Sequence, residues 1–165
     1  MAPARPGSPD DSPPRLPAPG MLRRLAAMFY ESLLLLAVLS VVFLLPQAAI
    51  ATLRNAVAPT ALLVIHFVAV TAFYFVWFWH GGGQTLAMKT WRIRLEGAGD
   101  GRPISAGKAL VRFCLAWPSV LTGIGLLWAL VDRDGQFLHD RLARTRLVLT
   151  PLFPPEHRGG RGEEQ

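Results

Sequence analysis

Charge and cysteine are what this chain has least of. Only 17% of its 165 residues are charged, and Cys114 is its one cysteine. A single cysteine excludes a disulfide framework, and we expect Cys114 to act as a small apolar filler. No cluster has the spacing of a zinc site, and no serine, histidine and aspartate form a recognisable motif. The sequence therefore predicts no catalytic residues, no cofactor, no metal and no enzymatic activity.

Acidic residues are also scarce, since 11 of them stand against 17 lysines and arginines, and the net charge is +6. Such a balance is typical of proteins that bind nucleic acid and of loops that face an anionic membrane surface. Here the basic residues flank long apolar runs and form no basic face of their own. We therefore predict a lipid bilayer as the partner and expect no binding to nucleic acid.

Apolar periodicity is missing at both ends of the chain. Residues 1–20 hold seven of the fourteen prolines, and residues 151–165 mix proline, glycine and charge. Segments of this composition bury too little surface to offset the entropy of ordering them. We predict two disordered tails that flank one transmembrane domain, residues 21–150.

Two apolar runs are long enough to cross a bilayer. The first spans residues 25–45, where Pro46 is expected to end it, and the second spans residues 60–79. At the rise of a helix the first run measures about 31 Å, the thickness of a hydrocarbon core. A cleaved leader is the alternative for the first run, but the long proline-rich segment before it and the carboxylate of Glu31 within it disfavour cleavage.

A third apolar run, residues 109–131, is interrupted. It carries Arg112 near its start, and then Pro118, Gly123 and Gly125. These residues predict a broken helix. The expected fold is an all-α membrane protein, with a two-helix transmembrane hairpin and a third broken or re-entrant apolar helix.

Lysine and arginine counts predict the orientation. Four precede the first run, one lies in the loop 46–59, and five lie between residues 80 and 108. The N-terminus is therefore expected in the cytoplasm, as in a multi-pass protein of the cytoplasmic membrane. Six more arginines come after the third run, which would break the rule if that run crossed fully. A re-entrant path and a full crossing both stay open.

Two short segments alternate as strands do. Trp91, Ile93 and Leu95 alternate with Arg92 and Arg94, and residues 145–150 form a second apolar segment of this kind. A period of two predicts strands. We expect a small cytoplasmic β-hairpin-like element at the membrane surface. We also expect the preceding glycines, 81–83, to turn the chain sharply, and Gln84 and Thr85 to cap the next segment.

Three stretches carry a resemblance. RRLAAMFYESLLLL, GGGQTLAMKTWRIRLEGAGDGRPISAGKALVRF and LLWALVDRDGQFLHDRLARTRLVL together resemble the RDD family of bacterial integral membrane proteins. The family takes its name from one arginine and two aspartates. Arg24 matches the arginine, Glu31 replaces the first aspartate, and Asp140, or less closely Asp132, matches the second. The resemblance implies a place in the bacterial inner membrane and a part in the transport of an unknown ligand.

Five residues are the candidate site. Arg24 and Glu31 share a helix face two turns apart, and a water, or a third group such as Arg112 or Arg141, would have to link them. We predict a polar cluster or ion pathway made of Arg24, Glu31, Asp140, Arg112 and His66.

Each candidate also has a structural alternative. The carboxylate of Glu31 is interpreted as a pin between helices, as a proton or cation relay, or as an incidental group that snorkels to the surface. His66 is interpreted as an interhelical hydrogen-bond partner or as a proton shuttle. Asp140 is expected to pair with the neighbouring Arg141, Arg144 and Arg146. Asp132, Asp134, His139 and Asp140 would make at most a weak metal site, because no second histidine or cysteine is near.

The sequence thus leaves two functions open, a transport protein and a non-transporting structural or assembly factor. Two or three helices enclose little volume, so we predict a homo-oligomer or a membrane partner protein.

Overall fold

The computed structural model describes residues 16–132 and 135–151 of the chain. Its first helical unit runs from Met21 to Arg54 without a break and comprises α1 (Met21–Leu39), a π-helical turn η1 (Ser40–Leu44) and α2 (Leu45–Arg54). At 34 residues, this unit measures about 51 Å and exceeds the thickness of a bilayer core. The first predicted helix is therefore present but longer than expected at both ends.

Pro46 does not end this helix, contrary to expectation. A proline inside a helix lacks the N–H for one hydrogen bond, and its ring collides with the carbonyl four residues earlier, here that of Val42. The π-helical turn η1 lies directly before Pro46 and includes Val42. A turn with one extra residue displaces that carbonyl, so the helix continues past the proline.

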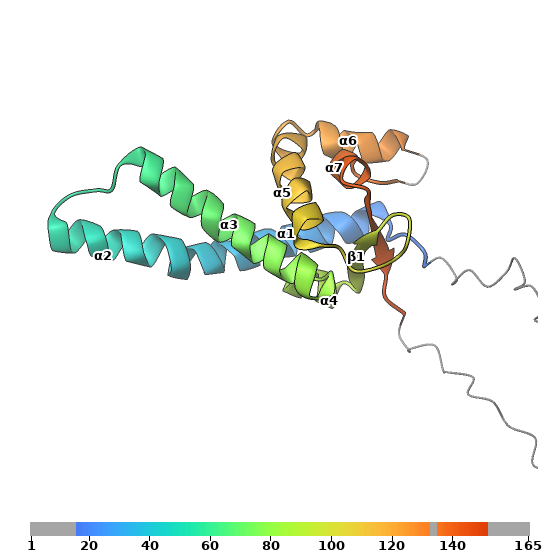
Figure 1. The fold of residues 1–165 in the computed structure, drawn as a ribbon, viewed down its shortest axis with the longest axis horizontal. Coiled ribbons are helices and arrows are strands. Elements are labelled where there is room, and N and C mark those ends of the chain that lie inside the picture. The colour runs from blue at the N-terminus through green and yellow to red at the C-terminus, as the bar shows by residue number, and fades with distance from the viewer. Residues whose placement is uncertain (1–15, 133–134, 152–165) are drawn as a thin grey trace, which may run out of the picture.

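The second long helix, α3 (Thr60–Gly82), folds back along the first unit, and the two make the elongated hairpin of Figure 1. Both are long and apolar enough to cross a membrane. Gly83 ends α3 in the left-handed conformation, with φ of 70°, and its carbonyl accepts from the Leu95 N–H at 2.7 Å. The turn therefore depends on Gly83, and Gly81 and Gly82 belong to the helix.

The remaining elements gather at one end of the hairpin. They are α4 (Leu86–Thr90), β1 (Ile93–Gly97), α5 (Ala106–Leu121), α6 (Ile124–Val131), α7 (Leu138–Leu142) and β2 (Thr145–Leu149). Thr85 caps α4 as predicted, accepting from Met88 N–H, whereas Gln84 donates to the carbonyl of Ile93 instead.

The two predicted strands form one antiparallel sheet. Ile93 pairs with Leu149 and Gly97 with Thr145. Leu149 N–H also donates to the carbonyl of Pro17 at 2.9 Å, so residues of the predicted N-terminal tail continue onto the sheet. The rest of both predicted tails lies outside the described residues.

The third apolar run is broken, as predicted, and the break lies at Gly123. Helices α5 and α6 meet at 92°, and Gly123 takes a φ of 71° there. Pro118 lies inside α5 and does not end it. Because β1 precedes α5 and β2 follows α7, the sheet brings the two ends of this bent segment together.

Burial divides the molecule into two regions. No residue between Ser32 and Val70 is buried within the chain; we call residues 32–70 the outer hairpin. The other described residues, which we call the junction, hold the whole hydrophobic core. The central cluster consists of Ala27, Trp79, Met88, Ile93, Leu95, Ile104, Ala109 and Phe113.

Candidate functional site

A cavity of about 360 Å³ lies in the junction between α1, α3, α5 and the sheet. Most of its lining is apolar, including Phe75, Trp79, Phe113 and Trp117. Its polar lining residues are Arg24, Glu31, Ser32, Arg112 and His139. Apolar walls with a few convergent polar groups are the usual character of a small-molecule site, and the volume falls in the usual range.

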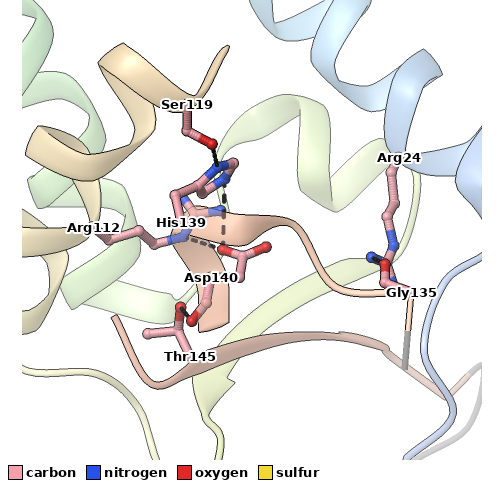
Figure 2. A network of polar contacts seen from close by, with 7 residues as sticks. All are labelled: Arg24, Arg112, Ser119, Gly135, His139, Asp140 and Thr145. Carbon is pink, nitrogen blue, oxygen red and sulfur yellow. Dashed lines mark hydrogen bonds and ion pairs between the residues drawn. The ribbon is translucent and has the colours of Figure 1, made fainter. Parts of the chain in front are cut away.

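Two arginines enter the cavity from different helices. Arg112 of α5 stacks on the ring of Trp79, with its guanidinium carbon 4.1 Å from the ring centroid, and donates from Nε to Asp140 at 2.7 Å. Arg24 of α1 lies 5.6 Å from the ring of Phe137 and donates to the carbonyls of Pro19 and Gly135. Figure 2 shows Arg24 extending toward the backbone of Gly135 and Arg112 extending toward Asp140 of α7. Their positions are therefore fixed by stacking and hydrogen bonds.

Asp140 of α7 is the counter-ion of Arg112. It is 1% exposed, and its Oδ1 accepts from Arg112. Its Oδ2 is buried and has no hydrogen-bond partner among the described residues. The charges of Asp140 and Asp132 also act on Arg24 at longer range, whereas Figure 2 shows Asp140 in contact with Arg112 and His139. The predicted pairing of Asp140 with its neighbours in the sequence is wrong, since Arg141 pairs with Asp132 and Arg146 with Glu96.

His139 lines the cavity beside this pair. Its Nδ1 lies 3.1 Å from Ser119 Oγ, and its Nε2 lies 3.7 Å from Asp140 Oδ1 (Figure 2). The pKa of His139 is lowered from 6.5 to about 4, chiefly by burial and also by Arg112, while Asp140 opposes the shift. The imidazole is therefore neutral at neutral pH.

Ser119, His139 and Asp140 form a serine–histidine–aspartate arrangement that the sequence did not reveal, because Ser119 lies twenty residues upstream. Ser119 is buried and is not among the residues that line the cavity. A nucleophile has to reach its substrate, so this serine serves as a hydrogen-bond partner of the imidazole.

Glu31 lines the same cavity from α1, two turns after Arg24. Its Oε1 accepts from the Tyr74 hydroxyl at 2.6 Å, and its Oε2 accepts from the Thr85 hydroxyl. Thr85 also caps α4, so the carboxylate joins α1 to α3 and α4. Arg24 and Glu31 thus line the same cavity, but neither Arg112 nor Arg141 links them.

Comparison with known protein families identifies the family of this chain. The model of the RDD family matches residues 18–144. The chain belongs to the RDD family. No curated protein and no solved structure matches it. Membership of this family and the two long apolar helices identify an integral membrane protein.

Within this RDD protein, four of the five predicted site residues meet in the junction and one lies apart. Arg24, Glu31 and Arg112 line the cavity, and Asp140 lies behind Arg112. His66 lies in the outer hairpin, where its Nδ1 is 2.8 Å from Gln47 Nε2. That contact joins α2 to α3, which confirms the interhelical interpretation.

One further prediction for the RDD chain is wrong. Cys114 is exposed on α5 instead of filling a core. Among the described residues, no group of three potential metal ligands occurs. Asp134, one member of the weak metal alternative, lies outside the described residues.

Sequence reasoning did not assign Tyr74, Thr85, Ser119 or His139 to this site, although it predicted Thr85 as a helix cap and His139 as a member of a weak metal site. Tyr74 and Thr85 donate to Glu31, His139 lines the cavity, and Ser119 contacts His139. Tyr74 is interpretable from the sequence only as part of an aromatic run, and nothing in the spacing shows which turn of α3 meets Glu31.

Proposed function

We propose that this RDD protein is a multi-pass protein of the bacterial inner membrane, with both ends of its described chain in the cytoplasm. The charge distribution supports this orientation, because Arg54 is the one lysine or arginine in loop 46–59, whereas basic residues crowd the junction. The sheet supports it as well. Strands that are hydrogen-bonded to each other lie on one side of a bilayer, so α5 and α6 dip into the membrane and return.

The proposed role is in transport of an ion or small ligand through the junction cavity. The observation that carries this role is that three ionisable residues of two helices, Arg24, Glu31 and Arg112, line one cavity at the end of a membrane hairpin. Ionisable groups inside membrane segments are costly and usually mark a ligand or proton path. We expect no enzymatic activity.

A single chain does not enclose a path across the bilayer, since the outer hairpin consists of two helices with no buried residue. We therefore propose that the protein works as a homo-oligomer or with a membrane partner protein. The apolar outer faces of α2 and α3 are available for such contacts, and for lipid.

A structural or assembly role is the second candidate. It is favoured by the hydrogen bonds of Glu31, since both carboxylate oxygens already hold side chains of other elements. In this role the carboxylate only fastens α1 to the junction.

The substitution Glu31→Gln separates these roles. The purified variant is reconstituted into liposomes, and proton flux is measured with an entrapped pH dye under an imposed pH gradient, with sodium or potassium as counter-ion. The transport role predicts a folded variant whose flux is lost. The structural role predicts a variant that accumulates poorly, with flux no different from wild type in the surviving fraction.

Glu96→Gln is the matched control. Glu96 pairs with Arg146 at the sheet and does not line the cavity. We expect it to lower thermal stability and leave flux unchanged. Full accumulation of Glu31→Gln with unaltered flux would contradict both roles.

A further inference from the structure

The junction cavity has donors of hydrogen bonds that the protein itself does not use. Among the described residues, Arg112 donates only through Nε, to Asp140, and Arg24 donates through Nε and Nη1. Both Nη atoms of Arg112 and the Nη2 of Arg24 are left for a ligand. Guanidinium groups with free, fixed donors are suited to carboxylate and phosphate oxygens.

The charge at this end of the cavity is also unbalanced. Arg112 is paired with Asp140, and His139 is neutral at neutral pH. The charges of Asp140 and Asp132 also act on Arg24. Asp132 is paired with Arg141, and Arg24 has no ion pair of its own among the described residues. Glu31, the other charged lining residue, lies about 10 Å from Arg24 along α1, and its oxygens accept from Tyr74 and Thr85.

The opposite end of the cavity is apolar and borders the lipid-facing surface. Leu35, Val120 and Leu121 line it, and Leu121 is 75% exposed. Helix α1 packs mainly on α4, and α5 packs on α3 and α7. Leu35 of α1 and Leu121 of α5 both line the cavity, so the space between these two helices is the candidate route from the surface to Arg24.

We propose that this cavity binds a single-chain amphiphile with an anionic head, a carboxylate or a phosphate. The head is held by Arg24, and the chain runs past Phe75 and Trp117 to leave between α1 and α5 near Leu121. The inference rests on the proposed function in one respect, that the cavity is a ligand site, and it names the ligand class.

Binding of radiolabelled palmitate to the purified full-length protein in a non-ionic detergent tests the ligand class. We expect saturable binding, displacement by unlabelled palmitate, and displacement by hexadecanol only at concentrations about tenfold higher or more. Equal displacement by hexadecanol or by hexadecyltrimethylammonium would overturn the anionic head. Displacement by inorganic phosphate alone at low millimolar concentration would overturn the amphiphile, since a free anion would then suffice.

Two substitutions at neighbouring arginines test whether Arg24 binds the anionic head. Arg24→Gln is expected to weaken palmitate binding about tenfold and to leave hexadecanol binding unchanged, which also shows that the cavity is intact. Arg23→Gln is the matched control, because Arg23 is exposed and does not line the cavity. Equal effects of the two substitutions on palmitate would overturn the assignment.

A steric variant tests the route of the chain. Ala116 lines the cavity from α5, whereas Cys114 is exposed on the opposite face of the same helix. Ala116→Phe is expected to weaken palmitate and hexadecanol alike, by about tenfold or more, and Cys114→Phe to change neither. Unchanged palmitate binding by a folded Ala116→Phe protein would overturn the cavity as the site.

These assays measure binding without flux, so the two proposals fail separately. Palmitate binding without proton flux would leave the inference standing and remove the support for ion transport. Proton flux that depends on Glu31, without palmitate binding, would overturn the inference and leave the transport role.

Discussion

The outer hairpin and the junction differ in how much of their surface is buried and in the interactions that stabilise them. Residues 32–70 bury none of their side chains within the chain, so their apolar surfaces are available to lipid or to other chains. The junction buries aromatic rings, arginines and carboxylates against one another. In lipid there is little hydrophobic force between helices, so the outer hairpin is held by its helices' own hydrogen bonds. The junction, by contrast, depends on specific polar contacts, and substitutions there are expected to have the larger effects.

The largest effect is expected at the Arg112–Asp140 pair. Asp140→Asn keeps the shape of the side chain but removes the carboxylate that is paired with Arg112. Leaving one member of a buried pair without its counter-ion costs about 3–5 kcal/mol. We expect a strongly lowered thermal unfolding temperature in detergent, or no folded protein at all.

The matched control is Asp100→Asn. Asp100 is an exposed residue of the turn after β1, and its Oδ1 accepts from the backbone of Arg102, a bond that asparagine can keep. The expected change is within about 0.5 kcal/mol. The double variant Arg112→Met/Asp140→Leu removes both charges and should therefore recover part of the unfolding temperature that Asp140→Asn loses. If Asp140→Asn were as harmless as Asp100→Asn, the importance assigned to the junction would be wrong.

The next largest effect is a pH dependence of stability that arises from His139 in the junction. His139 has a pKa of about 4 in the folded protein, against an ordinary value of 6.5. Its folded pKa is the lower one, so the stability it supports is fully present above pH 6.5 and is lost as pH falls through about 4. The full difference is about 3 kcal/mol. The measurement is the unfolding temperature of wild type and His139→Gln over this range, and the variant should show the shallower slope. Parallel curves would show that His139 does not titrate differently on folding.

The smallest effect is expected in the outer hairpin. Gln47 and His66 form its interhelical side-chain hydrogen bond, and such bonds average about 0.6 kcal/mol within membranes. Gln47→Leu should shift the unfolding temperature slightly and leave palmitate binding unchanged. A fall in unfolding temperature as large as that of Asp140→Asn would contradict the proposed difference between the two regions.

Sequence reasoning recovered the features that depend on local pattern. The two long helices, the break in the third run and both strands are explained by apolar runs, glycine and alternation. The course of the first helix past Pro46 was not predicted, because a π-helical turn depends on three-dimensional accommodation of the proline ring. The bend at Gly123 was placed within a range and not at a residue.

Partners of the polar residues could not be predicted in the same way. Asp140 lies beside Arg141 in the sequence, yet it pairs with Arg112 of another helix. Glu31 was expected to need a cationic link and instead accepts from two hydroxyl groups. Which side chains meet is decided by the rotation and crossing of helices, and periodicity does not determine either.

The central claim is that the sheet returns the bent α5–α6 segment to the side from which it started. A reporter that is active only in the cytoplasm, fused after Gln165 in one protein, before Met1 in a second and within loop 55–59 in a third, tests it most directly. We predict activity at both ends of the chain and none in the loop. Activity before Met1 with none after Gln165 would mean that α5–α6 crosses the membrane, and would contradict the pairing of β1 with β2 on which the re-entrant path depends.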